Sequence, residues 1–73
     1  MKSLDPLRAF GQRLRELREN AGLSQEKLAE MAELHRNYVG SLERGSSNVS
    51  LLAMVRLARC LNVRPAKLLE LVR

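Results

Sequence analysis

Few side chains in this 73-residue sequence could take part in covalent or metal chemistry. It has one histidine, His35, and one cysteine, Cys60. A single thiol excludes an internal disulfide, and one histidine with one cysteine makes no zinc-ligand cluster. Glu43 is the acidic residue that could pair with His35, but no nucleophile–base pair is evident. We therefore expect no enzyme, no metal site and no cofactor.

The charge balance favours a polyanionic partner instead. There are 13 Lys and Arg against 8 Asp and Glu, a net charge of +5. Nucleic acid is the commonest partner for such an excess, although a merely soluble basic domain has the same composition. No apolar run approaches the roughly 18 to 20 residues of a membrane span, and no signal-peptide pattern opens the sequence. These features predict a cytoplasmic protein with no membrane partner.

The length predicts one domain, residues 1–73. A domain this short buries only about 60% of the surface that its unfolded chain exposes, so a partner subunit would add needed buried area. Without a second domain there is no obvious place for a small-molecule sensor, and we expect no small-molecule ligand.

Capping residues and glycines divide the sequence into five amphipathic helices, and strand patterns are absent. Asp5 followed by Pro6 begins the first helix, and Ser24 and Ser50 are expected N-caps. Gly22 and Gly45 are expected to follow helix ends. The sequence thus predicts an all-α fold with helices at about residues 6–20, 25–32, 36–43, 51–61 and 65–72.

The last two helices carry more apolar side chains than a small core easily absorbs. The buried stripe expected on the fourth helix is Leu51, Met54, Val55, Ala58 and Leu61. Exposed apolar patches usually mark association sites, so we expect part of the last helix to contact a second copy. The alternative is that it packs under the first helix. Cys60 is interpreted as a small hydrophobe near that contact rather than a redox sensor. The predicted homodimer contact comprises Met54, Cys60, Leu61, Leu68, Leu69 and Val72.

Residues 25–44, QEKLAEMAELHRNYVGSLER, contain two short helices with a brief connection. Such helices must cross steeply, which requires small or apolar side chains where they touch. Those positions are occupied by Leu28, Ala29, Ala32, Leu34, Val39 and Leu42. The segment therefore predicts two crossing helices that share one core.

The same segment resembles the helix-turn-helix of phage repressor and Cro-like (Xre-type) regulators, chiefly in LSQEKLAE, residues 23–30, and LERG, residues 42–45. The resemblance implies a five-helix, lambda-repressor-like domain with its helix-turn-helix at about residues 24–44. LHRNYVGSLERG followed by NVSL is more narrowly similar to the controller proteins of restriction–modification systems. Those are small dimers that regulate the timing of endonuclease expression.

This resemblance implies a transcriptional regulator, a repressor or an activator, that binds double-stranded DNA. A homodimer would bind a pseudo-palindromic operator with half-sites about 10 bp apart. RNA polymerase is a further expected partner. The alternative is an antitoxin-like protein-interaction module, because the same fold can carry different functions.

The resemblance also implies which residues contact DNA. The third helix would enter the major groove, with Arg36 bonded to guanine O6 and N7 and Asn37 to adenine or a phosphate. Ser41 would reach a base or a phosphate, and Gly40 would allow close approach. Gln25 would bind a phosphate at the start of the second helix. Further candidates beside the phosphate strands are Arg44, Ser46, Ser47 and Asn48. Arg13, on the exposed side of the first helix, is either another phosphate candidate or a solvated side chain.

Two further positions have alternative roles, and two depart from the family pattern. Tyr38 either presses on the sugar–phosphate backbone, donating its hydroxyl there, or packs at the edge of the core. His35 is a capping or DNA-facing residue, and a weaker cap than serine. Glu33 stands where glycine is common and requires a left-handed backbone at a cost of about 1 kcal/mol. Arg64 replaces the serine or threonine cap that often precedes the last helix.

Overall fold

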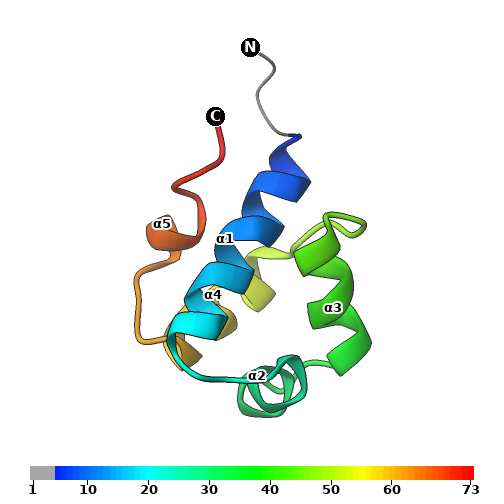
Figure 1. Ribbon diagram of the computed structural model, residues 1–73, viewed down its shortest axis with the longest axis vertical. Coiled ribbons are helices and arrows are strands. Elements are labelled where there is room, and N and C mark those ends of the chain that lie inside the picture. Colours follow the sequence, from blue (N-terminus) through cyan, green and yellow to red (C-terminus); the bar gives the residue numbers. More distant parts are fainter. Residues whose placement is uncertain (1–4) are drawn as a thin grey trace.

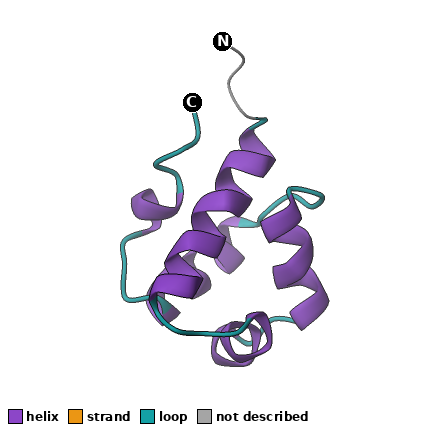
Figure 2. Cartoon of the chain, in the orientation of Figure 1, coloured by secondary structure: helices purple, strands orange, loops and turns teal. Residues whose placement is uncertain are grey.

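The computed structural model describes residues 5–73, so the first four residues of the predicted domain lie outside the described part. These 69 residues form five helices, and no strand occurs among them (Figures 1 and 2). The helices are α1 (Pro6–Asn20), α2 (Gln25–Ala32), α3 (Arg36–Arg44), α4 (Leu51–Cys60) and α5 (Pro65–Leu68). The all-α prediction is confirmed.

The predicted N-caps begin the helices as expected. Asp5 Oδ1 accepts a hydrogen bond from Leu7 N at 2.8 Å, which satisfies a free donor at the start of α1. Ser24 Oγ accepts from Lys27 N at 2.9 Å, and Ser50 Oγ accepts from Ala53 N at 3.0 Å. Arg64 supplies no side-chain cap to α5.

Helix α1 packs against α3 on one side and α5 on the other (Figure 1). Helix α2 contacts both α3 and α4. Gly11 makes the crossing of α1 and α3 possible, because a Cβ atom there would overlap the backbone carbonyl of Leu42. The fully buried side chains of the core are Leu14, Leu28, Val39, Leu42, Leu57 and Leu68. The contact residues predicted for the two crossing helices lie in or against this core.

Two predictions about the C-terminal half are wrong. Helix α5 ends at Leu68 instead of residue 72, and the chain continues through turns. The apolar face of α4 is centred on Ala53, Leu57 and Ala58. At about 100° per residue, Leu51 lies about a quarter-turn from that centre and Leu52 almost opposite it. Leu51 is accordingly 74% exposed, although the stripe pattern predicted it to be buried.

Two of the predicted dimer contacts are also unavailable. Leu68 is 0% exposed and Leu61 is buried, because both pack into the core of their own chain. The alternative that the last helix packs against α1 therefore describes Leu68 correctly. None of the helices combines the length and apolar composition needed to cross a bilayer, as far as the described residues extend.

Candidate nucleic-acid interface

The turn between α2 and α3 positions the candidate recognition helix. Glu33 adopts φ 57° and ψ 43°, the left-handed conformation predicted for this position. The chain then reverses so that Leu34 N donates to Ala29 O at 2.9 Å. His35 is the N-cap of α3, with Nδ1 accepting from Asn37 N at 3.1 Å. Its ring therefore satisfies a helix-end donor, which is one of the two roles predicted for it.

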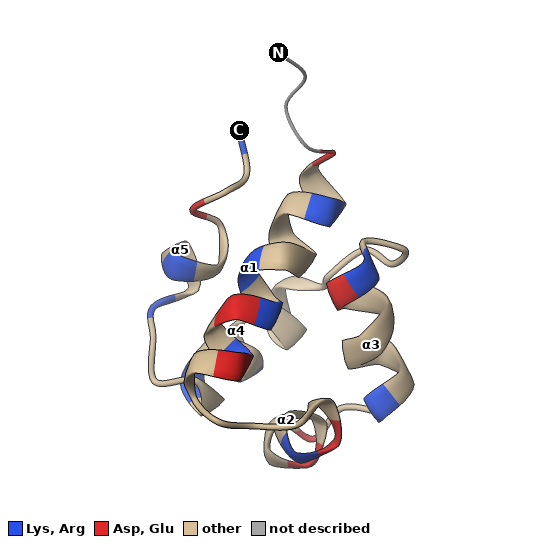
Figure 3. Cartoon of the chain, in the orientation of Figure 1, with Lys and Arg blue, Asp and Glu red and all other residues tan. Residues whose placement is uncertain are grey.

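A hollow between the starts of α2 and α3 brings together several residues that were predicted to contact DNA. Its lining comprises Gln25, Glu26, Arg36, Asn37, Gly40 and Arg44, of which all but Glu26 were predicted to contact DNA. Gly40 keeps the hollow open, since a Cβ there would lie 3.5 Å from Gln25 Oε1 and 3.3 Å from Arg44 Nη1. Basic residues stand at both ends of α3 (Figure 3). This face can offer cationic and amide donors to phosphates and base edges.

The loop after α3 continues from the C-terminal end of that helix. Ser46 and Asn48 are exposed, and Ser47 is half-buried. Ser46 Oγ donates to Ser41 O at 3.1 Å, so this serine also closes the end of α3. The Ser41 hydroxyl donates to Tyr38 O at 2.8 Å, which leaves its oxygen free only as an acceptor. Binding a phosphate through Ser41 would require that hydroxyl to turn.

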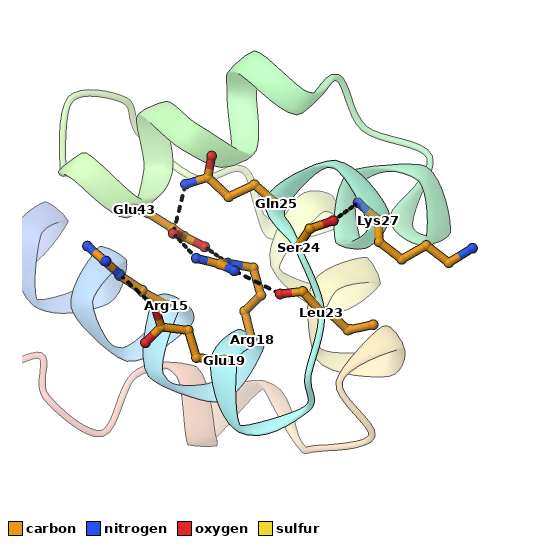
Figure 4. Close-up of polar contacts among 8 residues, drawn as sticks. All are labelled: Arg15, Arg18, Glu19, Leu23, Ser24, Gln25, Lys27 and Glu43. Atoms are coloured by element: carbon orange, nitrogen blue, oxygen red, sulfur yellow. Dashed lines mark hydrogen bonds and ion pairs between the residues drawn. The ribbon is translucent and has the colours of Figure 1, made fainter.

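A partly buried ion pair connects this face to α1 and was not predicted from the sequence (Figure 4). Arg18 binds Glu43 through Nε–Oε2 at 2.6 Å and Nη2–Oε1 at 3.1 Å. Arg18 Nη1 also donates to Leu23 O at 2.8 Å, and Gln25 Nε2 donates to Glu43 Oε1 at 3.0 Å. The hydrogen bonds that Arg18 donates to the Glu43 carboxylate raise the pKa of Arg18. The pair thereby fixes α3, the α1–α2 loop and the carboxamide of Gln25.

Tyr38 packs against the core, the second of its two predicted roles. Its hydroxyl donates to Asn48 O at 3.0 Å and accepts from Ser50 N at 3.2 Å. The single hydroxyl proton is therefore engaged within the chain and is not free for a phosphate. Tyr38 connects α3 to the segment that begins α4.

The structure contradicts the expectation that Arg13 lies on the exposed side of α1. Its side chain is 16% exposed and lies 3.1 Å from Glu70, measured from Nη2 to Oε2. Arg13 Nε also donates to Lys67 O at 3.3 Å. Arg13 thus joins α1 to α5, on the side of α1 opposite α3 (Figure 1). Periodicity predicted the polar side of the helix but not the neighbour that covers it.

Comparison with known proteins agrees with this geometry. The sequence pattern of the helix-turn-helix family matches residues 14–68. The chain belongs to the helix-turn-helix family. Its members are DNA-binding transcription regulators, which is not a class of enzyme.

Relatives of this helix-turn-helix protein include controllers of restriction–modification systems. Control protein C.BamHI of Bacillus amyloliquefaciens is 44% identical over 84% of this chain and 76% of its own length. The crystal structure of the controller protein C.AhdI from Aeromonas hydrophila is 55% identical, covering 85% of this chain and 94% of that one, with a TM-score of 0.84. The biofilm regulator SinR, solved in complex with DNA, is 32% identical over 84% of this chain and 98% of that one, with a TM-score of 0.80.

The exposed apolar surface of the helix-turn-helix protein differs from the predicted dimer contact. Met54, Cys60 and Val72 are half-buried against the core, and Leu69 is exposed. Burial raises the pKa of the Cys60 thiol, which disfavours a reactive thiolate and fits an apolar role. The large exposed apolar side chains are Met31, Leu51, Leu52, Leu69 and Leu71. Leu51 was missed because it was assigned to the inward side of α4, and Leu52 was missed because it was given no role.

Proposed function

We propose that this protein is a controller of a restriction–modification system that binds a pseudo-palindromic operator as a homodimer. The observation that carries the proposal is the hollow at the helix-turn-helix, where Gln25, Arg36 and Asn37 converge. Similarity to the controllers C.BamHI and C.AhdI supports the narrower biological role. A cytoplasmic location and contact with RNA polymerase at the promoter belong to the same proposal.

The DNA contacts divide into base-reading and phosphate-binding groups. Arg36 and Asn37 are exposed in the first turn of α3, where side chains of a recognition helix meet base edges. Gln25 stands at the N-terminus of α2, and its second amide hydrogen can bind a phosphate while the first is held by Glu43. Residues proposed to bind phosphates after α3 are Arg44, Ser46, Ser47 and Asn48.

Dimerisation is supported by the exposed apolar side chains of α4 and the C-terminal turns. Leu51 and Leu52 are largely exposed, and Leu69 and Leu71 are partly exposed. Covering such side chains is favourable by about 25 cal/mol for each Å² of apolar area removed from water. A second copy would supply that cover and also place a second recognition helix on the operator.

Selection of bound sites from a random duplex library tests the proposal. We expect enrichment of a two-fold symmetric site that is bound about a thousandfold more tightly than scrambled DNA. Affinity should fall as the salt concentration rises. The logarithm of the binding constant should fall linearly with the logarithm of the salt concentration, with a slope near −0.9 for each phosphate contacted. Absence of any enriched sequence would overturn the regulator proposal, and capture of one tight protein partner would then favour the interaction-module alternative.

A further inference from the structure

An acidic side chain stands beside the arginine proposed to read a base. Glu26 Oε2 lies 3.2 Å from Arg36 Nη1, and this contact joins the first turn of α2 to the first turn of α3. The side chains of Arg36 and Glu26 are 66% and 72% exposed. Exposed ion pairs contribute little to folding stability. The pair therefore calls for an explanation other than stability.

The local electrostatics favour this pairing. Arg36 is in the first turn of α3, where a positive charge opposes the helix dipole, and no acidic residue of α3 lies in that turn. Glu26 is in the first turn of α2, where a negative charge is favourable. Glu26 thus supplies from α2 the negative charge that the start of α3 lacks. The hollow that contains the pair also has Arg44 on its lining, with the neutral side chains of Gln25 and Asn37.

The contact leaves Arg36 able to bind DNA. A guanidinium group has five N–H donors in a rigid plane, and the contact with Glu26 occupies one of them. The remaining donors can form the two parallel bonds to guanine O6 and N7. Arg36 can accordingly bind Glu26 and a guanine at the same time. A carboxylate held on one edge restricts rotation of the plane, so less side-chain entropy is lost when the base is bound.

We propose that Glu26 is a positioning residue that determines base specificity through Arg36. It orients the guanidinium for guanine, and its negative charge weakens binding to arbitrary DNA by opposing the phosphates. This inference rests on the proposed operator binding and deepens it. It explains why an acidic residue lies in a hollow that otherwise gathers DNA-binding groups.

Two substitutions separate the contributions of charge and orientation. Glu26→Gln removes the charge but keeps an oxygen that can accept from Arg36, whereas Glu26→Ala removes both. The control is Glu30→Ala, because Glu30 is an exposed acid of the same helix whose ion-pair partner is Lys27, at 3.7 Å. Affinity is measured for the selected operator, for versions with each other base pair at the Arg36 position, and for scrambled DNA.

Both Glu26 variants should bind scrambled DNA about two- to threefold more tightly, since one phosphate-repelling charge is lost. Glu26→Ala should reduce the preference for guanine at the Arg36 position by about tenfold, and Glu26→Gln by less. Glu30→Ala should keep the wild-type base preference. In an Arg36→Ala background, Glu26→Ala should no longer change base preference, because the two residues act together.

The result that overturns the inference is a Glu26→Ala variant that retains the wild-type preference for guanine. Operator binding by the wild type would in that case leave the proposed function intact. A wild-type protein without any sequence preference would instead contradict the proposed function, and the inference with it. Thermal unfolding of each variant confirms that a change in base preference is not a loss of fold.

Discussion

The two ion pairs at the opposite ends of α3 differ in how far their side chains are exposed to water. Arg18–Glu43 lies at the C-terminal end of the helix, with side chains 12% and 3% exposed, and has further bonds to Leu23 O and Gln25. Arg36–Glu26 lies at the N-terminal end, with both side chains about two-thirds exposed. The first pair joins two packed helices, α1 and α3, and little of it is exposed to water. The second can change by rotation of exposed side chains.

This difference shows how one short helix serves both the fold and the site. Charges removed from water are costly unless they are paired, so Arg18 and Glu43 bind each other and fix the C-terminal end of α3. Exposed charges are inexpensive to rearrange, so Arg36 remains available to a ligand. Substitutions at the two ends should therefore affect different measurements, stability at one end and DNA recognition at the other.

The largest expected effect comes from Glu43→Ala. It leaves the Arg18 guanidinium mostly buried without its carboxylate, which should lower the free energy of unfolding by about 3–5 kcal/mol. Urea unfolding followed by circular dichroism measures the change. Replacing both partners with apolar residues, as in Arg18→Met with Glu43→Leu, should recover most of the stability. A loss below about 1 kcal/mol in Glu43→Ala would show that the pair is not needed for the fold.

The same change, glycine to alanine, should have different effects at Gly11 and Gly40. At Gly11 the added methyl group meets the backbone of Leu42 and Glu43, so α1 and α3 must separate, and we expect a loss of about 1–3 kcal/mol in the free energy of unfolding. At Gly40 it meets only the ends of two flexible side chains. That variant should keep its stability or gain up to about 1 kcal/mol, and should bind the operator more weakly. Equal stability losses would contradict this contrast.

Arg36→Ala should affect recognition with little effect on the fold. We expect operator affinity to fall by about 1–3 kcal/mol and specificity to relax at one base pair. The free energy of unfolding should change by no more than about 0.5 kcal/mol, because the pair with Glu26 is exposed. Titration of operator variants in a gel-shift assay measures both affinity and specificity. Uniform weakening on every sequence would assign Arg36 to a phosphate instead.

The smallest effect is expected at Glu70, an exposed carboxylate. The hydrogen bond from Lys67, with the charges of Lys67 and Arg13, lowers the pKa of Glu70. A lowered folded-state pKa stabilises the protein above the unfolded-state value of about 4, and this stabilisation is lost as the pH falls through the folded-state pKa. The urea midpoints of wild type and Glu70→Gln should therefore differ slightly at pH 7 and converge below pH 4. A constant difference across this range would exclude the ionisation as its cause.

Much of the fold could be predicted because its signals are local. The caps Asp5, Ser24 and Ser50 act on backbone groups within three residues, so their chemistry can be inferred from neighbouring positions. The left-handed backbone of Glu33 was predicted from the family resemblance, since glycine is common at that position of the turn. Five residues of the hollow were predicted to contact DNA, because helical spacing and the family resemblance both indicated them.

The unpredicted features depend on residues far apart in the sequence. Arg13 and Arg18 both lie on α1, yet Arg13 faces Glu70 and Arg18 faces Glu43. Helical periodicity assigns each to a side of α1 but does not identify the helix that packs there. Leu51 shows a related limit, since an apolar residue can belong to an amphipathic pattern and still lie beyond the edge of the core.

The bonds of the Tyr38 hydroxyl have a consequence for operator geometry. They join α3, the helix proposed to read the operator, to the residues just before α4, next to the exposed Leu51 and Leu52. A dimer assembled through those leucines would hold its two α3 helices at a nearly fixed distance and relative rotation. One inserted base pair rotates a half-site by about 34° around the duplex axis. Operators with altered spacing should therefore be rejected even when both half-sites are intact.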